Sequence, residues 1–375
     1  MTDRTAYARA GVDVAAGERA VELMRASVAS TRRPEVLGGL GGFGSAIAIP
    51  PGMREPVLVS STDGVGTKTA IAAAMSRFDT IGIDLVAMCA DDVVCTGAEP
   101  LAFLDYVAVG RLDPANVAEL VAGVADGCRQ AGCALVGGET AEHPGLMEVG
   151  EFDLAGFCVG IAERGRLLDG TAATSGDVIV GLAASGLHAN GYSLVRALIA
   201  ERDLDLHGPY QALLRQALGD AEAAALMAAE PDHAMATLGE VLLTPTRIYA
   251  RDVLAIRDAL AADGQDLRGV AHITGGGLPG NVPRALPEAL GARLDPATWP
   301  MPSVMRLVGA LAGMEDDELR ATFNGGLGMV LVVSRAAADR TLALARARGL
   351  DAWAVGEVSD AAALDGRRYV EEARS

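Results

Sequence analysis

The chain contains almost no lysine. Among its 31 basic residues, Lys68 is the only lysine and the others are arginine. Acidic residues outnumber basic ones by 49 to 31, which gives a formal net charge of -18. Such an excess opposes binding to nucleic acid or to an anionic membrane unless basic side chains cluster locally, and the sequence shows no such cluster. The composition therefore predicts a protein with no nucleic-acid partner and no membrane partner.

Long apolar runs and paired cysteine motifs are also missing. No run approaches the roughly 18 residues that span a bilayer, and residues 1–4 are not followed by the apolar segment of a signal peptide. The five cysteines are odd in number and form no C-x-x-C, which favours reduced, buried thiols over disulfides or a zinc site. With 375 residues, half of them hydrophobic, we expect a globular cytoplasmic protein of two or three domains.

The single lysine ends a short motif, DGVGTK, at residues 63–68. The apolar run 57–61 predicts a strand before it, and the Ala-rich run 69–75 predicts a helix after it. At such a junction glycines admit a ligand, helix N–H groups face an anion, and an ammonium can contact phosphate. Asp63 beside an anion indicates a divalent cation between them, so the motif favours metal-nucleotide binding. The alternative is a glycine turn with one exposed lysine, and the spacing is not that of a Walker A loop.

Acidic residues occur where the pattern predicts burial. Residues 80–97 are apolar on nearly every face, as in an interior helix, yet Asp84 and Asp91 share one face and Asp92 is adjacent. Buried carboxylates persist when they are paired, hydrogen-bonded or bound to metal. Metal is favoured for at least one of them, with helix capping or ion pairs as the alternatives. Glu139 follows a short predicted strand at 134–136, where it is either a ligand group or part of a solvated acidic turn.

Glycine-rich segments recur in both halves of the chain. Residues 38–44 contain a formal G-x-G-x-x-G, but it follows a predicted helix at 15–30 and a proline turn, so a dinucleotide fingerprint is disfavoured. A flap that closes over a ligand is an alternative to a plain linker.

In the second half, predicted strands lead into polar loops that contain His188 and His272, and the helix after the second loop is expected at 281–286. A lone histidine is more often structural, but the adjoining glycines make these two candidates for function. We expect a domain boundary at 163–177 and a helical hairpin at 209–230. The alternation of strands and helices predicts an α/β fold with α+β layers.

Together these motifs resemble one family, the phosphoribosylformylglycinamidine cyclo-ligases, or aminoimidazole ribonucleotide synthetases, of purine biosynthesis. The resemblance extends from about residue 10 to residue 358. It rests on AGVD, TRRPEVLGGLGGFG, DGVGTK, TIGIDLVAMC, LVGGETAE, AGFCVG, SGLHANGYSLVR, TPTRIY, HITGGG and FNGGLGM, which occur in this order.

The resemblance implies a fold of two domains. Residues 1–165 would bind ATP and form a homodimer, in which the mixed sheets of two copies make a barrel-like core. Residues 175–358 would form a C-terminal α/β domain. The implied reaction is the ATP-dependent ring closure of formylglycinamidine ribonucleotide to aminoimidazole ribonucleotide, through phosphoryl activation of the formyl oxygen and attack by a nitrogen of the same molecule.

The resemblance also implies site residues by position. Asp63, Asp92 and Glu139 would hold Mg²⁺ on the ATP, and Lys68, His188 and His272 would be catalytic. Contacts to ATP would come from Gly41, Gly42, Phe43, Gly44, Asp63, Gly64, Gly66, Thr67 and Lys68. Contacts to the ribonucleotide would come from His188, Asn190, His272, Thr274, Gly275 and Gly276.

The sequence departs from the family pattern at three places. Asp91 precedes Asp92 where the family usually has asparagine, which leaves open which of the two binds metal. Gly325 replaces a residue that is often cysteine, and the segment 209–230 is longer than usual. Two other functions compete: a kinase of the same superfamily that stops after phosphoryl transfer, and a nucleotide sensor without turnover. A selenophosphate synthetase is disfavoured because the first cysteine is Cys89, too late for a reactive residue in an N-terminal loop.

Overall fold

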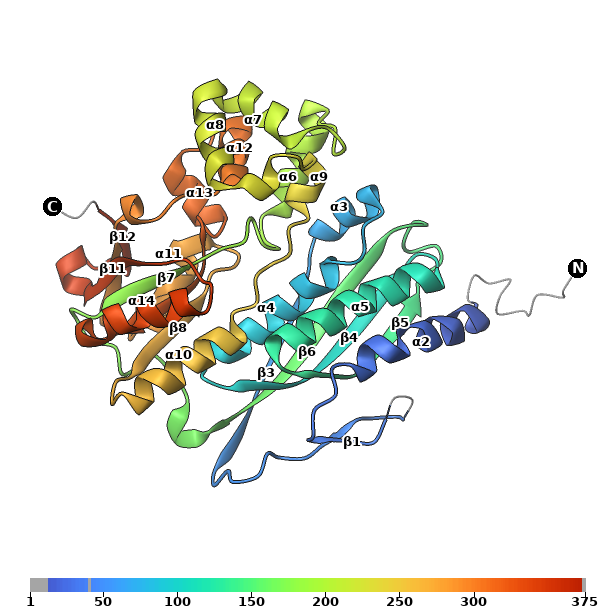
Figure 1. The fold of residues 1–375 in the computed structure, drawn as a ribbon, viewed down its shortest axis with the longest axis horizontal. Coiled ribbons are helices and arrows are strands. Elements are labelled where there is room, and N and C mark those ends of the chain that lie inside the picture. Colours follow the sequence, from blue (N-terminus) through green and yellow to red (C-terminus); the bar gives the residue numbers. More distant parts are fainter. Residues whose placement is uncertain (1–12, 40–41, 373–375) are drawn as a thin grey trace, which may run out of the picture. The chain divides into compact units, whose positions relative to one another are not determined.

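A computed structural model of the chain describes residues 13–39 and 42–372. The chain divides into two compact units (Figure 1). The first ends at Gly165 and the second begins at Arg166, except that Cys95–Gly97 belong to the second. Within the described residues, no helix has both the length and the apolar character needed to cross a membrane.

The first unit is built on a four-stranded sheet in the order β3-β6-β4-β5, in which β4 and β5 run parallel and the other neighbours antiparallel. The strands are β3 (Pro56–Gly64), β4 (Glu99–Val109), β5 (Ala134–Glu142) and β6 (Phe152–Glu163). The helices are α2 (Val14–Ala29), α3 (Lys68–Met75), α4 (Ile81–Cys95) and α5 (Pro114–Ala131). A small hairpin of β1 (Val36–Leu37) and β2 (Ala46–Ile47) flanks the glycine loop.

Helix α4 packs on one face of this sheet, on the side where Figure 1 also shows α5. A β-carbon on Gly156 of β6 would lie only 3.0 Å from Cγ of Leu85, so glycine at this position lets the helix approach the strand. A β-carbon on Gly82 would lie 2.2 Å from the backbone nitrogen of Val124, so α5 covers the other side of α4 equally closely. This double cover explains why α4 is buried along almost its whole length and confirms the predicted interior helix.

The opposite face of the sheet is open. Side chains of β6 alternate between buried and exposed from Phe152 to Cys158, which is the pattern of a strand with one solvated face. The exposed set includes large apolar side chains: Leu58 of β3 is 66% exposed, Phe157 of β6 is 43% exposed and Tyr106 of β4 is 39% exposed. The sheet of the isolated chain therefore presents an apolar surface to solvent.

The second unit contains a six-stranded sheet in the order β12-β9-β11-β7-β10-β8. Its strands are β7 (Val178–Ala183), β8 (Leu267–His272), β9 (Leu290–Leu294), β10 (Leu327–Val333), β11 (Ala352–Asp360) and β12 (Tyr369–Glu371). All neighbours are antiparallel except β12 and β9, which run parallel. Every residue of β10 is buried, because this strand lies inside the sheet with helices around it.

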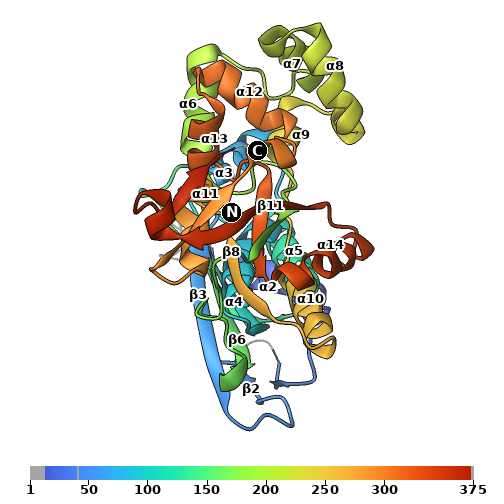
Figure 2. The ribbon, with the colours of Figure 1, turned by 90° about the vertical axis from the view of Figure 1, so that its left-hand side faces the viewer.

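The helices of the second unit follow the predicted alternation. They are α6 (Tyr192–Arg202), α7 (Tyr210–Leu218), α8 (Asp220–Ala229), α9 (Leu238–Leu242), α10 (Ala250–Ala262), α11 (Gly277–Asn281), α12 (Ser303–Ala312), α13 (Asp316–Thr322) and α14 (Ala338–Ala347). Short 3-10 turns are η1 (Arg164–Arg166), η2 (Pro231–His233), η3 (Val282–Ala285), η4 (Pro296–Thr298), η5 (Arg335–Ala337) and η6 (Ala361–Leu364). The helical hairpin expected at 209–230 is confirmed as α7 and α8, which lie beside α12 (Figures 1 and 2).

Two predictions about element boundaries were wrong. Strand β5 continues from Ala134 to Glu142, so Glu139 lies inside the strand and not at its end. The pairing of β5 with β4 extends the strand through the two glycines, which sequence propensity disfavours. Helix α11 begins at Gly277, where the sequence predicts the start at 281, because the glycine loop itself turns into the helix.

Candidate functional site

Lys68 is the first residue of α3 and is fully buried. Its Nζ donates to Oδ1 of Asp84, in the first turn of α4, at 2.8 Å. Burial lowers the pKa of Lys68, and the attraction of Asp84 opposes that change. At Asp84 the structure therefore shows the ion pair that the sequence left open as an alternative to metal binding. Lys68 is not the exposed lysine of an ordinary glycine turn.

Asp63 and Asp92 both lie near Cys89. Burial, together with the nearby charges of Asp63 and Asp92, raises the pKa of the Cys89 thiol to about 12. The Oδ1 atom of Asp63 accepts a 2.7 Å hydrogen bond from the backbone N–H of Gly64. Asp91 is fully buried whereas Asp92 is half-buried. Two of the three predicted metal ligands thus gather at one place, and of the acidic pair Asp92 is the one that solvent reaches.

Glu139 lies at the other edge of the sheet. Glu139 of β5 pairs with Tyr106 of β4, Tyr106 pairs with Ala155 of β6, and Ala155 pairs with Gly64 of β3, the residue after Asp63. Glu139 is therefore three strand spacings away from the strand that carries Asp63. With about 4.8 Å between neighbouring strands, this separation is roughly 14 Å. Among the residues that the structure describes, no group of three or more His, Cys, Asp or Glu side chains is arranged to hold a metal ion. One chain does not bring Asp63, Asp92 and Glu139 together.

A cavity of about 600 Å³ opens beside Glu139. It is lined by one side of α2, the glycine loop, part of β4 and the LVGGET segment within β5. Among the predicted site residues, the cavity is lined by Gly42, Phe43, Gly44 and Glu139. Gly41 lies outside the described residues. The structure thus joins two motifs that are separated by almost a hundred positions in the sequence.

Asp105 is a residue in the wall of this cavity that the sequence analysis missed. A β-carbon on Gly138 would lie 1.8 Å from Oδ1 of Asp105, so only glycine leaves room for this carboxyl group. Burial raises the pKa of Asp105 to about 7. Its Oδ2 is buried and has no hydrogen-bond partner among the described residues. The available signal was an aspartate in the middle of the otherwise apolar strand 101–109.

In the second unit, three loops meet where strands β7 and β8 end and the antiparallel strand β10 begins. They are the SGLHANG loop (185–191), the HITGGG loop (272–277) and the FNGG loop (323–326). Asn324 Nδ2 donates a 2.9 Å hydrogen bond to the carbonyl of Gly186, which links the FNGG loop to the SGLHANG loop. A β-carbon on Gly275 would lie 3.5 Å from Oδ1 of Asn190, so the HITGGG loop lies beside both.

His188 is buried and adopts a positive φ of 65°, which is uncommon outside glycine. The backbone N–H of Ser185 donates to Nε2 of His188 at 3.1 Å, and this bond assigns the imidazole proton to Nδ1. The ring lies beside Tyr249, with centroids 6.3 Å apart. A β-carbon on Gly328 would lie 2.5 Å from Cε1 of His188, so this glycine makes space for the ring.

His272 and its neighbours form the second histidine loop. His272 is buried at the end of β8, opposite Met329. Asn281 Nδ2 donates to the carbonyls of Thr274 and Gly275, at 3.3 and 3.2 Å, and so fixes the loop. Gly276 precedes α11 with a φ of 87°. The structure brings together the predicted residues His188, Asn190, His272, Thr274, Gly275 and Gly276, although both imidazoles lie below the surface.

Comparison with known proteins identifies the family. Residues 46–162 match the N-terminal domain of the AIR synthase related protein family, and residues 174–367 match its C-terminal domain. The chain is 52% identical over 354 residues to the phosphoribosylformylglycinamidine cyclo-ligase of Anaeromyxobacter sp. (strain Fw109-5), which covers 94% of this chain and 95% of the relative. The chain belongs to the phosphoribosylformylglycinamidine cyclo-ligase family.

Solved structures of more distant proteins share the cyclo-ligase fold. Thiamine-monophosphate kinase from Stenotrophomonas maltophilia K279a is similar with a TM-score of 0.61 at 18% identity, covering 95% of this chain and 96% of that one. Hydrogenase maturation protein HypE in complex with ATP is similar with a TM-score of 0.61 at 17% identity, covering 95% and 91%. At these identities the likeness establishes the two-domain α/β fold.

Proposed function

We propose that this chain catalyses the ATP-dependent ring closure of formylglycinamidine ribonucleotide to aminoimidazole ribonucleotide in purine biosynthesis. The observation that carries the proposal is the 52% identity to a cyclo-ligase over 94% of the chain. As a member of this family it is an ATP-dependent ligase, and we assign it to the cytoplasm. We assign ATP binding and dimerisation to residues 1–165 and the ribonucleotide to the domain that begins near residue 175.

The reaction proceeds by activation and then cyclisation. The formyl oxygen attacks the γ-phosphorus of ATP, the bond from that phosphorus to the bridging oxygen breaks, and ADP leaves. An amidine nitrogen of the same molecule then attacks the activated carbon, the carbon–oxygen bond breaks, and phosphate leaves with the electron pair. The nitrogen loses its proton. Because the attack is intramolecular, positioning supplies much of the rate.

The first unit supplies the ATP contacts. Gly42, Phe43, Gly44 and Glu139 line the cavity, and we propose that this glycine loop, with Gly41, contacts the nucleotide there. The remaining proposed ATP contacts lie from the end of β3 to the start of α3. They are Asp63, Gly64, Gly66, Thr67 and Lys68. Lys68, held by Asp84 at 2.8 Å, supplies the positive charge that stabilises the transferring phosphoryl group.

Oxygen ligands for magnesium come from both edges of the sheet. Asp63 and Asp92, which lie together near Cys89, are the hard donors that Mg²⁺ prefers. Bound there, Mg²⁺ would neutralise charge on the triphosphate. Glu139 of the same chain is too distant to join the two aspartates. We therefore propose that Glu139 of a second copy completes the site.

The open face of the first sheet supports a homodimer. It exposes Leu58, Tyr106 and Phe157, and among the described residues the two edge strands, β3 and β5, each have a neighbouring strand on one side only. Closing two such sheets into a barrel buries the apolar face and removes the edges. In that arrangement β5 of one copy lies beside β3 of the other, which brings Glu139 toward Asp63.

The loops of the second unit supply the ribonucleotide contacts. Asn190, Thr274, Gly275 and Gly276 offer an amide, a hydroxyl and backbone groups to the substrate. His188, with its proton on Nδ1, and His272 act on the reacting amidine or hold it. We expect His188→Ala and His272→Ala to retain ATP binding, measured by calorimetry, and to lose ring closure.

One coupled assay tests the function. Purified protein is given formylglycinamidine ribonucleotide, ATP and Mg²⁺, and both ADP and aminoimidazole ribonucleotide are followed with time. The proposal requires the two products in equal amounts. ADP without ring closure would instead identify a kinase, and ATP binding without turnover would identify a nucleotide sensor.

A further inference from the structure

The C-terminal strand β12 lies beyond the residues that match the family's C-terminal domain, which end at 367. It is the edge strand of the six-stranded sheet, and its three residues pair in parallel with Ala292–Leu294 of β9. Such a short edge strand contributes few ladder hydrogen bonds. The side chain of Glu371 contacts α13, and this contact indicates a role other than extending the sheet.

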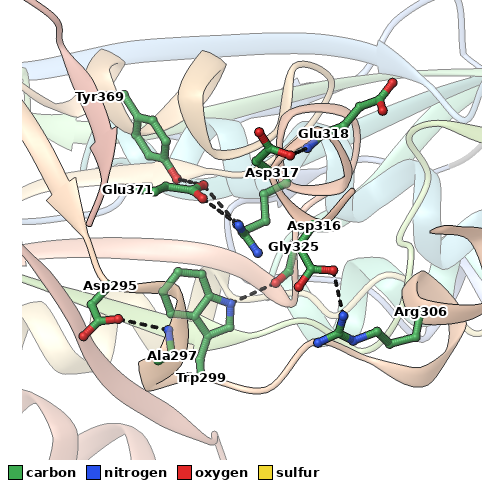
Figure 3. A network of polar contacts seen from close by, with 11 residues as sticks. Asp295, Ala297, Trp299, Arg306, Asp316, Asp317, Glu318, Gly325, Tyr369 and Glu371 are labelled. Carbon is green, nitrogen blue, oxygen red and sulfur yellow. Dashed lines mark hydrogen bonds and ion pairs between the residues drawn. The ribbon is translucent and has the colours of Figure 1, made fainter. Parts of the chain in front are cut away.

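Glu371 of β12 forms a bidentate ion pair with Arg320 of α13. Arg320 Nε lies 3.0 and 2.9 Å from the two carboxylate oxygens, and its second terminal nitrogen lies 2.6 Å from Oε2. Tyr369 directs its hydroxyl at the same carboxylate, at 2.8 Å (Figure 3). Burial lowers the pKa of Arg320, but the hydrogen bonds and charge of Glu371 outweigh it and hold that pKa above its usual value. A planar pair of this kind fixes the orientation of the guanidinium.

The aliphatic stem of Arg320 packs against Gly325 in the FNGG loop. A β-carbon on Gly325 would lie 2.6 Å from Cγ of Arg320, and Gly325 has a φ of 60°. From the other side, Trp299 Nε1 donates a 2.8 Å hydrogen bond to the Gly325 carbonyl (Figure 3). The loop is therefore clamped between a tryptophan and an arginine, at the position where the sequence departs from the family's frequent cysteine.

The clamped loop in turn touches the loops that we assign to the ribonucleotide. Asn324 Nδ2 bonds the Gly186 carbonyl, two residues before His188. The backbone of α13 also abuts the HITGGG loop, since a β-carbon on Gly277 would lie 2.0 Å from the Arg320 carbonyl oxygen. A continuous set of contacts thus leads from Glu371 through Arg320 to both histidine loops.

We propose that Glu371 and Arg320 are positioning residues for ribonucleotide binding, by which the C-terminal strand fixes the FNGG loop and, through it, the loop of His188. This inference rests on the proposed function of those loops. Neither residue touches the reacting atoms. Their effect falls on substrate geometry in the second unit and leaves ATP binding in the first unit alone.

The test compares Glu371→Gln with a matched control, Glu372→Gln. Glu372 is the next residue and its carboxylate lies 3.4 Å from Arg293 of β9, so the control removes an equal charge that does not contact α13. We expect Glu371→Gln to raise the KM for formylglycinamidine ribonucleotide or lower kcat by roughly 10-fold to 100-fold, the scale of a small misplacement. The KM for ATP should change less than about twofold, and Arg320→Gln with Glu371→Gln should be no worse than either alone. Glu372→Gln should match wild type.

A second readout does not depend on activity. Hydrogen exchange of peptides that cover 184–191 and 323–328 should quicken in Glu371→Gln and stay unchanged in Glu372→Gln. If wild type makes no aminoimidazole ribonucleotide while exchange behaves as expected, the proposed function fails, but the finding that Glu371 fixes the two loops stands. Unchanged exchange and an unchanged ribonucleotide KM in Glu371→Gln would overturn the inference, as would an equal loss for ATP and ribonucleotide.

Discussion

Lys68 and Asp84 form an ion pair in which both side chains are fully buried. An exposed lysine in a glycine turn could be replaced without loss of stability, but Lys68 is not exposed. Removing one member of a buried pair leaves a charge without compensation, which typically costs about 3–5 kcal/mol. We therefore expect Lys68→Ala to lower the free energy of unfolding by about that amount in urea titrations, in addition to its loss of activity.

A double variant separates the two roles of Lys68. Lys68→Met with Asp84→Leu removes both charges and should be more stable than Lys68→Ala, because no unpaired charge remains. It should still lose about two or more orders of magnitude in rate, the size expected for one stabiliser of transition-state charge. Turnover at the wild-type rate by this folded variant would rule out the phosphate role.

Asp105 predicts a dependence of stability on pH. Its pKa is raised to about 7 by burial, against an ordinary value of about 3.8. The folded protein therefore holds a proton there that the unfolded chain releases, and stability is lost as pH rises from about 4 through 7. Asp105→Asn should remove this loss, so its advantage over wild type in unfolding free energy should be larger at pH 8 than at pH 5. An equal difference at both pH values would contradict this prediction.

Glu230, which directly follows α8, connects the helical hairpin α7–α8 to α12 by hydrogen bonds. Its carboxylate accepts hydrogen bonds from the backbone N–H and hydroxyl of Ser303, at 2.8 and 2.5 Å, and lies 2.9 Å from Nδ1 of His233. Tyr210 contacts the same serine hydroxyl at 2.7 Å. Burial opposes ionisation of Glu230, but the bonds from His233 and Ser303 outweigh it and hold the pKa of this carboxyl below its usual value.

Glu230→Gln should therefore destabilise the protein at neutral pH, by about 1–3 kcal/mol for the loss of hydrogen bonds to a charged group. Because the folded pKa is lowered, the stabilisation is present above about pH 4.5 and disappears as pH falls through the folded value. Thermal unfolding from pH 7 to pH 3 should show the variant and wild type converging. Asp232→Asn, an exposed acid two residues away, should follow wild type throughout.

The proposed homodimer makes a prediction about the assembled protein. If the metal site combines Asp63 of one copy with Glu139 of the other, inactive Asp63→Asn and Glu139→Gln chains should restore activity when they are mixed during refolding. Random pairing gives one intact site in half of the dimers, or about a quarter of the wild-type activity. If both ligands act within one chain, each chain in a mixed dimer remains defective and the mixture stays inactive. Light scattering of each variant should show the same assembly as wild type.

The local sequence pattern was sufficient to predict the position of several helices. The helix predicted at 15–30 is α2, the helix predicted at 69–75 is α3, and the interior helix predicted at 80–97 is α4, each with closely similar bounds. Hydrophobic periodicity and the position of proline are local properties, so they are readable without the fold. Glu139 was misplaced at a strand end because pairing with β4 continues the strand through glycines, and no local signal reports a partner strand.

The sequence by itself determined the family, through long motifs in a fixed order, and with it the class of reaction. It also supplied the candidate site residues, because Lys68, the acidic residues and the histidine loops stand out against an apolar, lysine-poor background. Only the tertiary structure decided how they pair: that Lys68 meets Asp84, that Glu139 lies an entire sheet away from Asp63, and that Glu371 returns to clamp the FNGG loop. These contacts join residues far apart along the chain. They are set by sheet order and packing, which hydrophobic periodicity does not encode.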